Sequence, residues 1–307
     1  MIIKNADDKS DTLNELEKYL SDSRIPDDVK RKIERERNNI SAGAANECAS
    51  AYLIDFRYSA SPNWMVLHDL RIEEAGRTAQ IDHLLINRFL EFYVLESKSF
   101  GKGVAINELG EFNTWIANRP IGIASPIEQN RRHIAVLDDL LRALPTPKRL
   151  GIRLAPTLKS FVLVSNSANI KRPTKSKFNT DEVIKVDSLA TLIDGEIDRM
   201  GAGAMVAGMT KMVGQETIET LARLLLSEHR PIAFDYVGKF GLAPYFAVAR
   251  TVSAPDAPPQ SDVPKCPKCA IDMVMRQART GPNAGNFFWG CSAFPKCRGV
   301  LAVESGG

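Results

Sequence analysis

The segment at residues 80–98, QIDHLLINRFLEFYVLESK, decides the fold. It contains two strand-like runs, residues 80–86 and 91–98, rich in leucine, isoleucine and aromatic side chains. Only a short connection that includes Asn87 and Arg88 separates them. Two such runs joined by a short polar link are typical of an antiparallel hairpin, so we expect this pair at the centre of a sheet.

The hairpin also carries carboxylates on otherwise apolar strands. Strict alternation places Asp82 on one face with Leu84 and Ile86, and it places Glu96 beside Lys98. A carboxylate there is costly to bury unless it is paired or bound to metal. Two hard oxygen ligands suit Mg2+ or Mn2+, and a nearby ammonium can orient water or stabilise charge on a phosphate. On spacing alone, a structural salt-bridge cluster explains the same pattern.

Further elements extend from both ends of the hairpin. Apolar periodicity predicts helices at residues 10–20, 26–39, 42–58, 126–144, 188–200 and 216–229. It predicts strands at 64–70, 157–164 and 182–186 and a pair within 102–115. This order predicts a mixed α/β domain with a central sheet flanked by helices.

Four cysteines near the end of the chain indicate a separate small module. They stand as Cys266-x2-Cys269 and Cys291-x5-Cys297. A segment this short cannot bury enough apolar surface to fold unaided, whereas two thiolate pairs can complete a tetrahedral Zn2+ site. Nothing suggests a disulfide framework, so we expect a reducing, cytoplasmic compartment. Cys48 stands apart, and we expect it to be a small buried residue.

The cysteine module is rich in basic and aromatic residues. Its candidate DNA-binding residues are Lys265, Lys268, Arg276, Arg279, Phe287, Phe288, Trp289, Lys296 and Arg298. Cations can bind phosphates while bases stack on rings, which suits single-stranded nucleic acid. Alternatively, the aromatic residues form the module's own core, and we expect at least one of the three to do so. The run FFWGCSAFPKC at residues 287–297 resembles the C-terminal C4 zinc ribbon of type IA topoisomerases, which implies a small β ribbon that binds DNA.

The composition is that of an ordinary globular protein. The 307 residues carry a net charge of +3, which by itself does not argue for nucleic acid. No apolar stretch is long enough to cross a membrane, so we expect no membrane association. Residues 251–264, TVSAPDAPPQSDVP, read as a tether. The expected organisation is a helical extension at 1–40, an α/β domain at 41–250, this linker, and the zinc ribbon at 265–303.

Several motifs in the α/β segment resemble one family. GRTAQIDHLLI at residues 76–86 resembles the signature of the nuclease-related (NERD) domain, a member of the PD-(D/E)xK restriction-endonuclease-like superfamily. Gly43-x3-Glu47, YVLESK at 93–98 and SPIEQNRRHI at 125–134 resemble its other elements in the same order. The resemblance implies a restriction-endonuclease-like mixed sheet flanked by helices. The family usually has an apolar residue where Ser97 stands here.

The same resemblance implies roles for individual residues. Asp82 and Glu96 would be metal ligands, with the Ser97 backbone carbonyl as a third. Lys98 would position water or stabilise charge. Glu47 would be an accessory carboxylate and Gln129 would line the site, although a solvated helix glutamate and a structural glutamine explain these two equally simply.

The expected function is therefore a metal-dependent nuclease that cleaves DNA with Mg2+ or Mn2+, assisted by a Zn2+ ribbon that binds single- or double-stranded DNA. Defence against foreign DNA or DNA repair is the expected context, by analogy only. Two alternatives stay open: a non-catalytic DNA-binding adaptor and an RNA-directed nuclease. Self-association through the N-terminal helices and a protein partner in such a system stay open as well.

Overall fold

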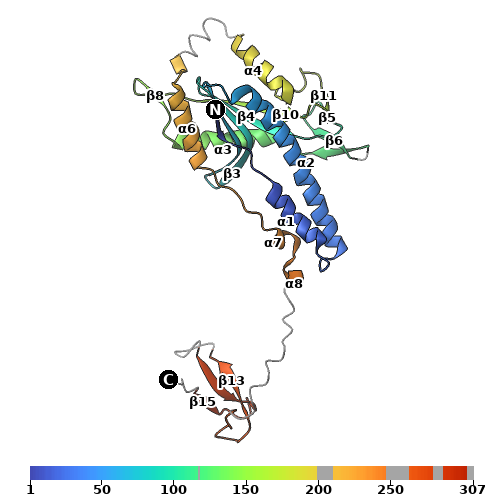
Figure 1. Cartoon of the computed structure of the whole chain (residues 1–307), viewed down its shortest axis with the longest axis vertical. Coiled ribbons are helices and arrows are strands. Elements are labelled where there is room, and N and C mark those ends of the chain that lie inside the picture. Colours follow the sequence, from blue (N-terminus) through green and yellow to red (C-terminus); the bar gives the residue numbers. More distant parts are fainter. Residues whose placement is uncertain (117, 199–209, 247–262, 279–285, 303–307) are drawn as a thin grey trace. The chain divides into compact units, whose positions relative to one another are not determined.

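The computed structural model describes residues 1–116, 118–198, 210–246, 263–278 and 286–302. The chain divides into two compact units, residues 1–243 and 244–307, which we call the body and the ribbon unit. Residues 251–262 of the predicted tether and Arg279 lie outside the described residues. Figure 1 shows the elements of both units.

A six-stranded mixed sheet forms the centre of the body, in the order β1-β2-β3-β4-β10-β12. Its strands are β1 (Ile2–Lys4), β2 (Trp64–Glu74), β3 (Arg77–Asn87), β4 (Glu91–Lys98), β10 (Thr157–Val164) and β12 (Val183–Lys185). Strands β3 and β4 pair antiparallel, with His83 opposite Leu95 and Ile86 opposite Phe92, which confirms the predicted hairpin. Strand β10 lies parallel to both β4 and β12. The mixed α/β class is therefore correct.

Helices cover both faces of this sheet (Figure 1). The described helices of the chain are α1 (Ser10–Ser21), α2 (Asp27–Tyr58), α3 (Pro126–Ala143), α4 (Leu189–Asp198), α6 (Gln215–Ser227), α7 (Tyr236–Phe240) and α8 (Ala243–Phe246), with a 3-10 turn at Val186–Ser188. Apolar residues of α3 and α6 pack on one face, which we call the first core. Residues of α2 and α4 pack on the other, the second core. Within the described ranges, no helix combines the length and apolar character needed to span a bilayer.

The N-terminal region differs from the sequence prediction. Helix α2 runs unbroken from Asp27 to Tyr58, where two helices were expected. Its interior contains Gly43, and a single glycine costs a helix only about 1 kcal/mol, which packing of the flanking turns can offset. The expected boundary at residue 40 therefore falls inside a helix. Strand β1, parallel to β2, was not predicted because three residues carry too little periodicity.

Smaller sheets extend the body. A four-stranded sheet has the order β11-β5-β6-β7, formed by β11 (Asn169–Lys171), β5 (Gly103–Ile106), β6 (Phe112–Ile116) and β7 (Arg119–Ile123). Strands β8 (Lys148–Arg149) and β9 (Ile152–Arg153) form a separate pair. Strands β5 and β6 are the expected pair, whereas β7, which is almost entirely exposed, was missed. Helix α3 follows this sheet and begins at Pro126, capped by the Ser125 side chain.

The inward and outward alternation of the central strands is interrupted once. On β2, Leu67 and Leu70 both lie in the first core, three residues apart, and Asp69 between them has a φ of 48°. On β3, Ile81 and Leu84 both lie in the same core, again three residues apart. Each strand therefore skips one step of its alternation at the same level of the sheet.

This interruption corrects the predicted placement of Asp82. Leu84 and Ile86 pack in the first core as expected. Asp82, however, lines a cleft together with Gly43 and Glu47 of α2, the helix that covers the other face. The alternation of side chains between the two faces of β3 does not continue through the skipped step. The prediction that Asp82 shares a face with Leu84 and Ile86 was therefore wrong.

The ribbon unit contains one small antiparallel sheet, β13-β14-β15. Its strands are β13 (Met273–Gln277), β14 (Phe287–Cys291) and β15 (Val300–Ala302). Among its described residues, the buried apolar side chains are those of Cys266, Met273 and Cys291, with Trp289 and Leu301 among the residues packed against them. So few apolar residues supply little folding free energy by themselves.

Candidate functional site

The Asp82 carboxylate is held in place by the backbone of the neighbouring strand. Its side chain is buried on β3, and Asp82 Oδ2 accepts a hydrogen bond from the Ser97 N–H at 2.7 Å. The pairing of β3 with β4 ends at His83 and Leu95, so Asp82 follows one step beyond it and faces the Glu96–Ser97 peptide. The hairpin therefore brings Asp82 and the Glu96-Ser97-Lys98 segment together.

Glu96 is only 2% exposed, and its two oxygens have different surroundings. Oε1 accepts a hydrogen bond from Gln129 Nε2 of α3 at 2.8 Å and lies 2.6 Å from Lys98 Nζ. Oε2 is buried without a hydrogen-bond partner among the described residues. His133 Nδ1, one turn after Gln129, approaches Oε2 at 3.5 Å without forming a hydrogen bond. Glu96 Oε1 thus has protein partners, whereas Oε2 has no hydrogen-bond donor among the described residues.

The surroundings of both carboxyl groups oppose their ionisation. Burial raises the pKa of Asp82 well above its usual range, and the nearby Glu96 and Glu47 raise it further. Burial also raises the pKa of Glu96, although Lys98 and Gln129 partly oppose this. The two carboxyl groups therefore favour protonation or a nearby cation, as is common for carboxylates of functional sites.

A cleft of about 780 Å3 opens beside Asp82. Among the charged side chains that line it, carboxyl groups outnumber cations: Asp7, Asp8, Glu36, Glu47, Asp69 and Asp82, against Lys9 and Arg71. Burial raises the pKa of Glu47, with Asp69 adding to the effect. Glu47 therefore contributes to the same group of negative charges as Asp82. A cleft with this charge favours cations and repels phosphates unless a cation is present.

The carboxylate pair fits a divalent cation of the hard type. Asp82 and the free Oε2 of Glu96 offer two oxygen ligands, and Mg2+ commonly takes only one or two protein carboxylates and keeps its waters. Within the part of the chain that is described, only the cysteines bring three or more ligand atoms within 4.8 Å of one another. The Ser97 carbonyl, expected as a third ligand, belongs to the Ser97–Lys98 peptide, the one that follows the peptide whose N–H donates to Asp82.

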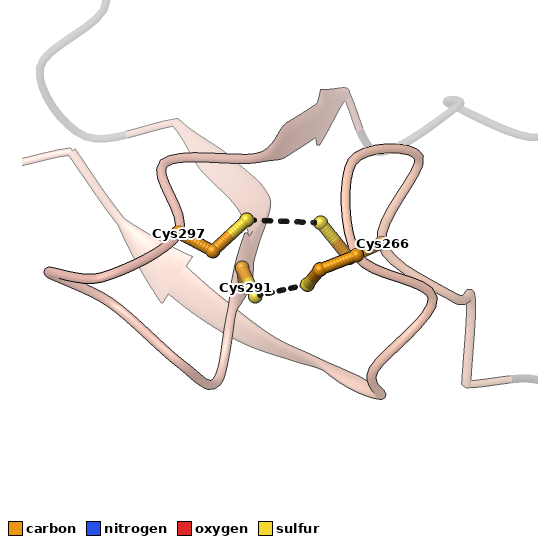
Figure 2. A group of neighbouring side chains, drawn as sticks. Cys266, Cys291 and Cys297 are labelled. Atoms are coloured by element: carbon orange, nitrogen blue, oxygen red, sulfur yellow. Dashed lines mark hydrogen bonds between the residues drawn. The ribbon is translucent and has the colours of Figure 1, made fainter.

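The four cysteines of the ribbon unit converge on one point (Figure 2). The Sγ atoms of Cys266 and Cys297 are 3.7 Å apart, and those of Cys269 and Cys291 are 3.4 Å apart. A tetrahedral Zn2+ with Zn–S bonds near 2.3 Å needs sulfurs about 3.8 Å apart, close to this arrangement. All four Sγ atoms lie within 4.8 Å of one another, so the site is a closed structural one that supports Zn2+.

The candidate DNA-binding residues of the ribbon differ in exposure. Phe287 is 57% exposed, whereas Trp289 packs against the buried cysteines, which confirms that one ring belongs to the core. Lys265 forms an ion pair with Asp272. Phe288 is half-buried. The remaining described candidates are exposed: Lys268, Arg276, Lys296 and Arg298.

The sequence patterns did not single out Phe294 or Asp69, and they predicted the wrong burial for Cys48. Phe294 is 54% exposed, and the Arg276 guanidinium lies 5.6 Å from its ring centre. Both residues line a cavity of about 250 Å3. Phe294 could have been found from the sequence, because it belongs to the zinc-ribbon-like segment FFWGCSAFPKC at residues 287–297. Asp69 was missed because it lines the cleft at the interruption of β2, where its φ is positive, and the sequence pattern does not reveal that interruption. Cys48, expected to be buried, is exposed on α2.

Comparison with known protein families gives two matches. Residues 42–165 match the nuclease-related domain, NERD, and residues 263–305 match the topoisomerase DNA binding C4 zinc finger. No curated protein and no solved structure matches the chain. The chain therefore carries a nuclease-related domain in its body and a topoisomerase-type C4 zinc ribbon at its C-terminal end, as the sequence motifs indicated.

The cysteine geometry predicts that metal removal unfolds the ribbon unit alone. A strong chelator should abolish amide hydrogen-exchange protection in β13, β14 and β15, because their few apolar contacts cannot hold the sheet together. Protection in β3 and β4 should stay unchanged. Hydrogen exchange read by mass spectrometry tests this, and protection that persists in β14 after zinc loss would contradict it.

The raised pKa of Asp82 predicts a cost in stability at neutral pH. A carboxyl whose folded pKa exceeds its unfolded value of about 4 binds more protons when folded, so folding is weakened as pH rises from 4 through the folded pKa. In Mg2+-free, zinc-loaded protein, Asp82→Asn should therefore be more stable than wild type at pH 7, and the difference should shrink toward pH 4. Urea unfolding across this range measures it. Asp139→Asn, at an exposed carboxylate, should leave the pH profile unchanged.

Proposed function

We propose that this chain is a divalent-metal-dependent nuclease that hydrolyses DNA phosphodiester bonds. The observation that carries the proposal is the buried pair Asp82 and Glu96 at the end of a β-hairpin, with one Glu96 oxygen unpartnered and Lys98 beside the other. A nuclease-related domain covers this site. A salt-bridge cluster kept only for structure would pair both oxygens of Glu96, because an unsatisfied buried oxygen costs about 1–3 kcal/mol.

The proposed metal site uses groups of the hairpin. Asp82, Glu96 and the Ser97 carbonyl would hold Mg2+ or Mn2+. When bound, such an ion lowers the pKa of water and stabilises negative charge on a phosphate. The acidic cleft supports a requirement for it, because a phosphodiester would otherwise meet mainly carboxylates there.

Three further side chains have distinct tasks in this proposal. The Lys98 ammonium, held by Glu96 Oε1, donates to a non-bridging phosphate oxygen or to the attacking water. Gln129 fixes Glu96 through the same oxygen, which keeps Oε2 directed away from the amide. Glu47 adds negative charge next to Asp82 and would orient a second water.

The ribbon unit would supply DNA affinity. It exposes five described cations, of which Lys265 is paired with Asp272, together with Phe287 and Phe294, a combination that suits phosphate contacts and base stacking. Because body and ribbon belong to one chain, binding at the ribbon raises the local concentration of DNA at the cleavage site. Defence against foreign DNA or DNA repair in the cytoplasm is the proposed setting, by analogy with enzymes that degrade DNA.

A cleavage assay tests the nuclease proposal. Asp82→Asn and Lys98→Ala should each lower the Mg2+-dependent cleavage rate by about 100-fold or more, the usual cost of removing a group that stabilises the transition state. Lys175→Ala removes an exposed, ion-paired lysine and should cleave like wild type. Single-stranded DNA, duplex DNA and RNA are compared side by side. Equal cleavage by all variants, or none by wild type, would favour the adaptor, and preference for RNA would reassign the substrate.

The exposed ring of Phe287 predicts a stacking contribution to DNA binding. Phe287→Ala should weaken single-stranded DNA binding by roughly 5- to 100-fold, since base–aromatic stacking contributes about 1–3 kcal/mol per base. Ile271→Ala changes a side chain of the same unit that is 48% exposed but has no ring. Fluorescence anisotropy at fixed salt compares the three proteins. An equal loss for both variants would show that Phe287 acts through area or folding and not through stacking.

A further inference from the structure

Four polar side chains form a continuous line across the sheet, directly behind the candidate site. Asp55 Oδ1 of α2 lies 3.0 Å from His68 Nε2 of β2, and His68 Nδ1 lies 2.7 Å from His83 Nδ1 of β3. His83 Nε2 lies 3.0 Å from Ser97 Oγ of β4. The two histidines are fully buried, Ser97 is buried, and the Asp55 side chain reaches the surface at 32% exposure.

The arrangement of donors and acceptors gives this line a direction. A carboxylate only accepts, so His68 donates to Asp55 through Nε2–H and, when neutral, accepts at Nδ1. His83 must then donate through Nδ1–H and accept at Nε2, which leaves the Ser97 hydroxyl as the donor of the last hydrogen bond. Burial and the adjacent His68 hold the pKa of His83 well below its usual range, in keeping with a neutral ring.

The line ends at the peptide on which the candidate site depends. Ser97 stands between Glu96 and Lys98, and its N–H is the donor to Asp82 Oδ2. His68 and His83 are direct cross-strand partners at the level where β2 and β3 skip a step of their alternation. The proposed cleavage chemistry uses neither histidine nor the Ser97 hydroxyl. A buried polar network at this place is costly to maintain unless every member is satisfied, and here each one is.

We propose that Asp55, His68, His83 and Ser97 form a directed hydrogen-bond chain that positions the Ser97 peptide for the divalent-ion site. The hydroxyl fixes the side-chain rotamer of Ser97, and the rotamer fixes the strand that presents Glu96 and Lys98. This inference rests on the proposed function for the ion, while the direction of the chain stands independently of it. Groups that orient metal ligands from behind commonly change ion affinity by about 10- to 100-fold.

The direction of the chain is tested by nitrogen NMR of histidine-labelled full-length protein. The expected result is two neutral imidazoles, His68 protonated at Nε2 and His83 at Nδ1. A His68 imidazolium, or a His83 ring protonated at Nε2, would overturn the directed chain. This measurement needs no divalent ion and no substrate, so its outcome does not depend on whether the protein is a nuclease.

The positioning role is tested by Mn2+ binding to zinc-loaded protein, measured by electron paramagnetic resonance. Ser97→Ala should bind Mn2+ about 10- to 100-fold more weakly, and Ser97→Thr, which keeps the hydroxyl, should recover most of the affinity. Asp55→Ala, at the exposed end of the chain, should weaken binding several-fold, while Asp55→Asn, which keeps an acceptor oxygen, should stay close to wild type.

Ser160→Ala separates positioning from general loss of stability. The Ser160 hydroxyl of β10 donates to Glu182 at 2.6 Å and accepts from Asn130 Nδ2 of α3 at 3.0 Å, so this variant also removes partly buried hydrogen bonds of the same sheet. It should lower the urea midpoint like Ser97→Ala while leaving Mn2+ affinity unchanged. Equal Mn2+ affinity for wild type and Ser97→Ala, or an equal loss in Ser160→Ala, would overturn the positioning role. If wild type binds no Mn2+, both the proposed metal site and the positioning role fail.

Discussion

The body depends on keeping two carboxyl groups, Asp82 and Glu96, next to each other and out of water. Desolvation alone makes this unfavourable, and their mutual repulsion adds to the cost. The structure offsets part of that cost through a backbone N–H on Asp82 and a lysine and a glutamine on Glu96. These compensating groups come from β4 and α3. The site therefore exists only when the hairpin and the helix behind it are both folded.

The ribbon unit follows the opposite principle. Its sheet has few apolar residues, and its order depends on four thiols that lie close enough to share one metal ion. Because the metal carries the folding free energy, most of the surface is free to display cations and rings. Exposed Phe287 and Phe294 would be a liability in a unit that needed them for its core. The body thus carries an acidic cleft, whereas the ribbon unit displays cations and exposed aromatic rings.

Much of the fold was predictable from local patterns. The bounds of β4 and β10 match the prediction, because both are continuous apolar runs with polar or proline-containing segments on either side. The cysteine cluster follows from spacing, and the residues of the hairpin site follow from their motif. The face of Asp82 could not be predicted, since it depends on a skipped step in β2 that the backbone at Asp69 makes visible. Likewise, nothing local distinguishes the buried His68 from a surface histidine, because its partners Asp55 and His83 come from two other elements, α2 and β3.

Helix α2 has a mechanical consequence. It is a single element of 32 residues that carries Glu47 and, two turns later, Asp55. At 1.5 Å per residue it is a rod about 48 Å long, and α1 packs against it to form a helical hairpin (Figure 1). A rod without a hinge transmits a tilt from one end to the other. A displacement of its N-terminal turns would therefore also move Gly43 and Glu47, which line the cleft beside Asp82.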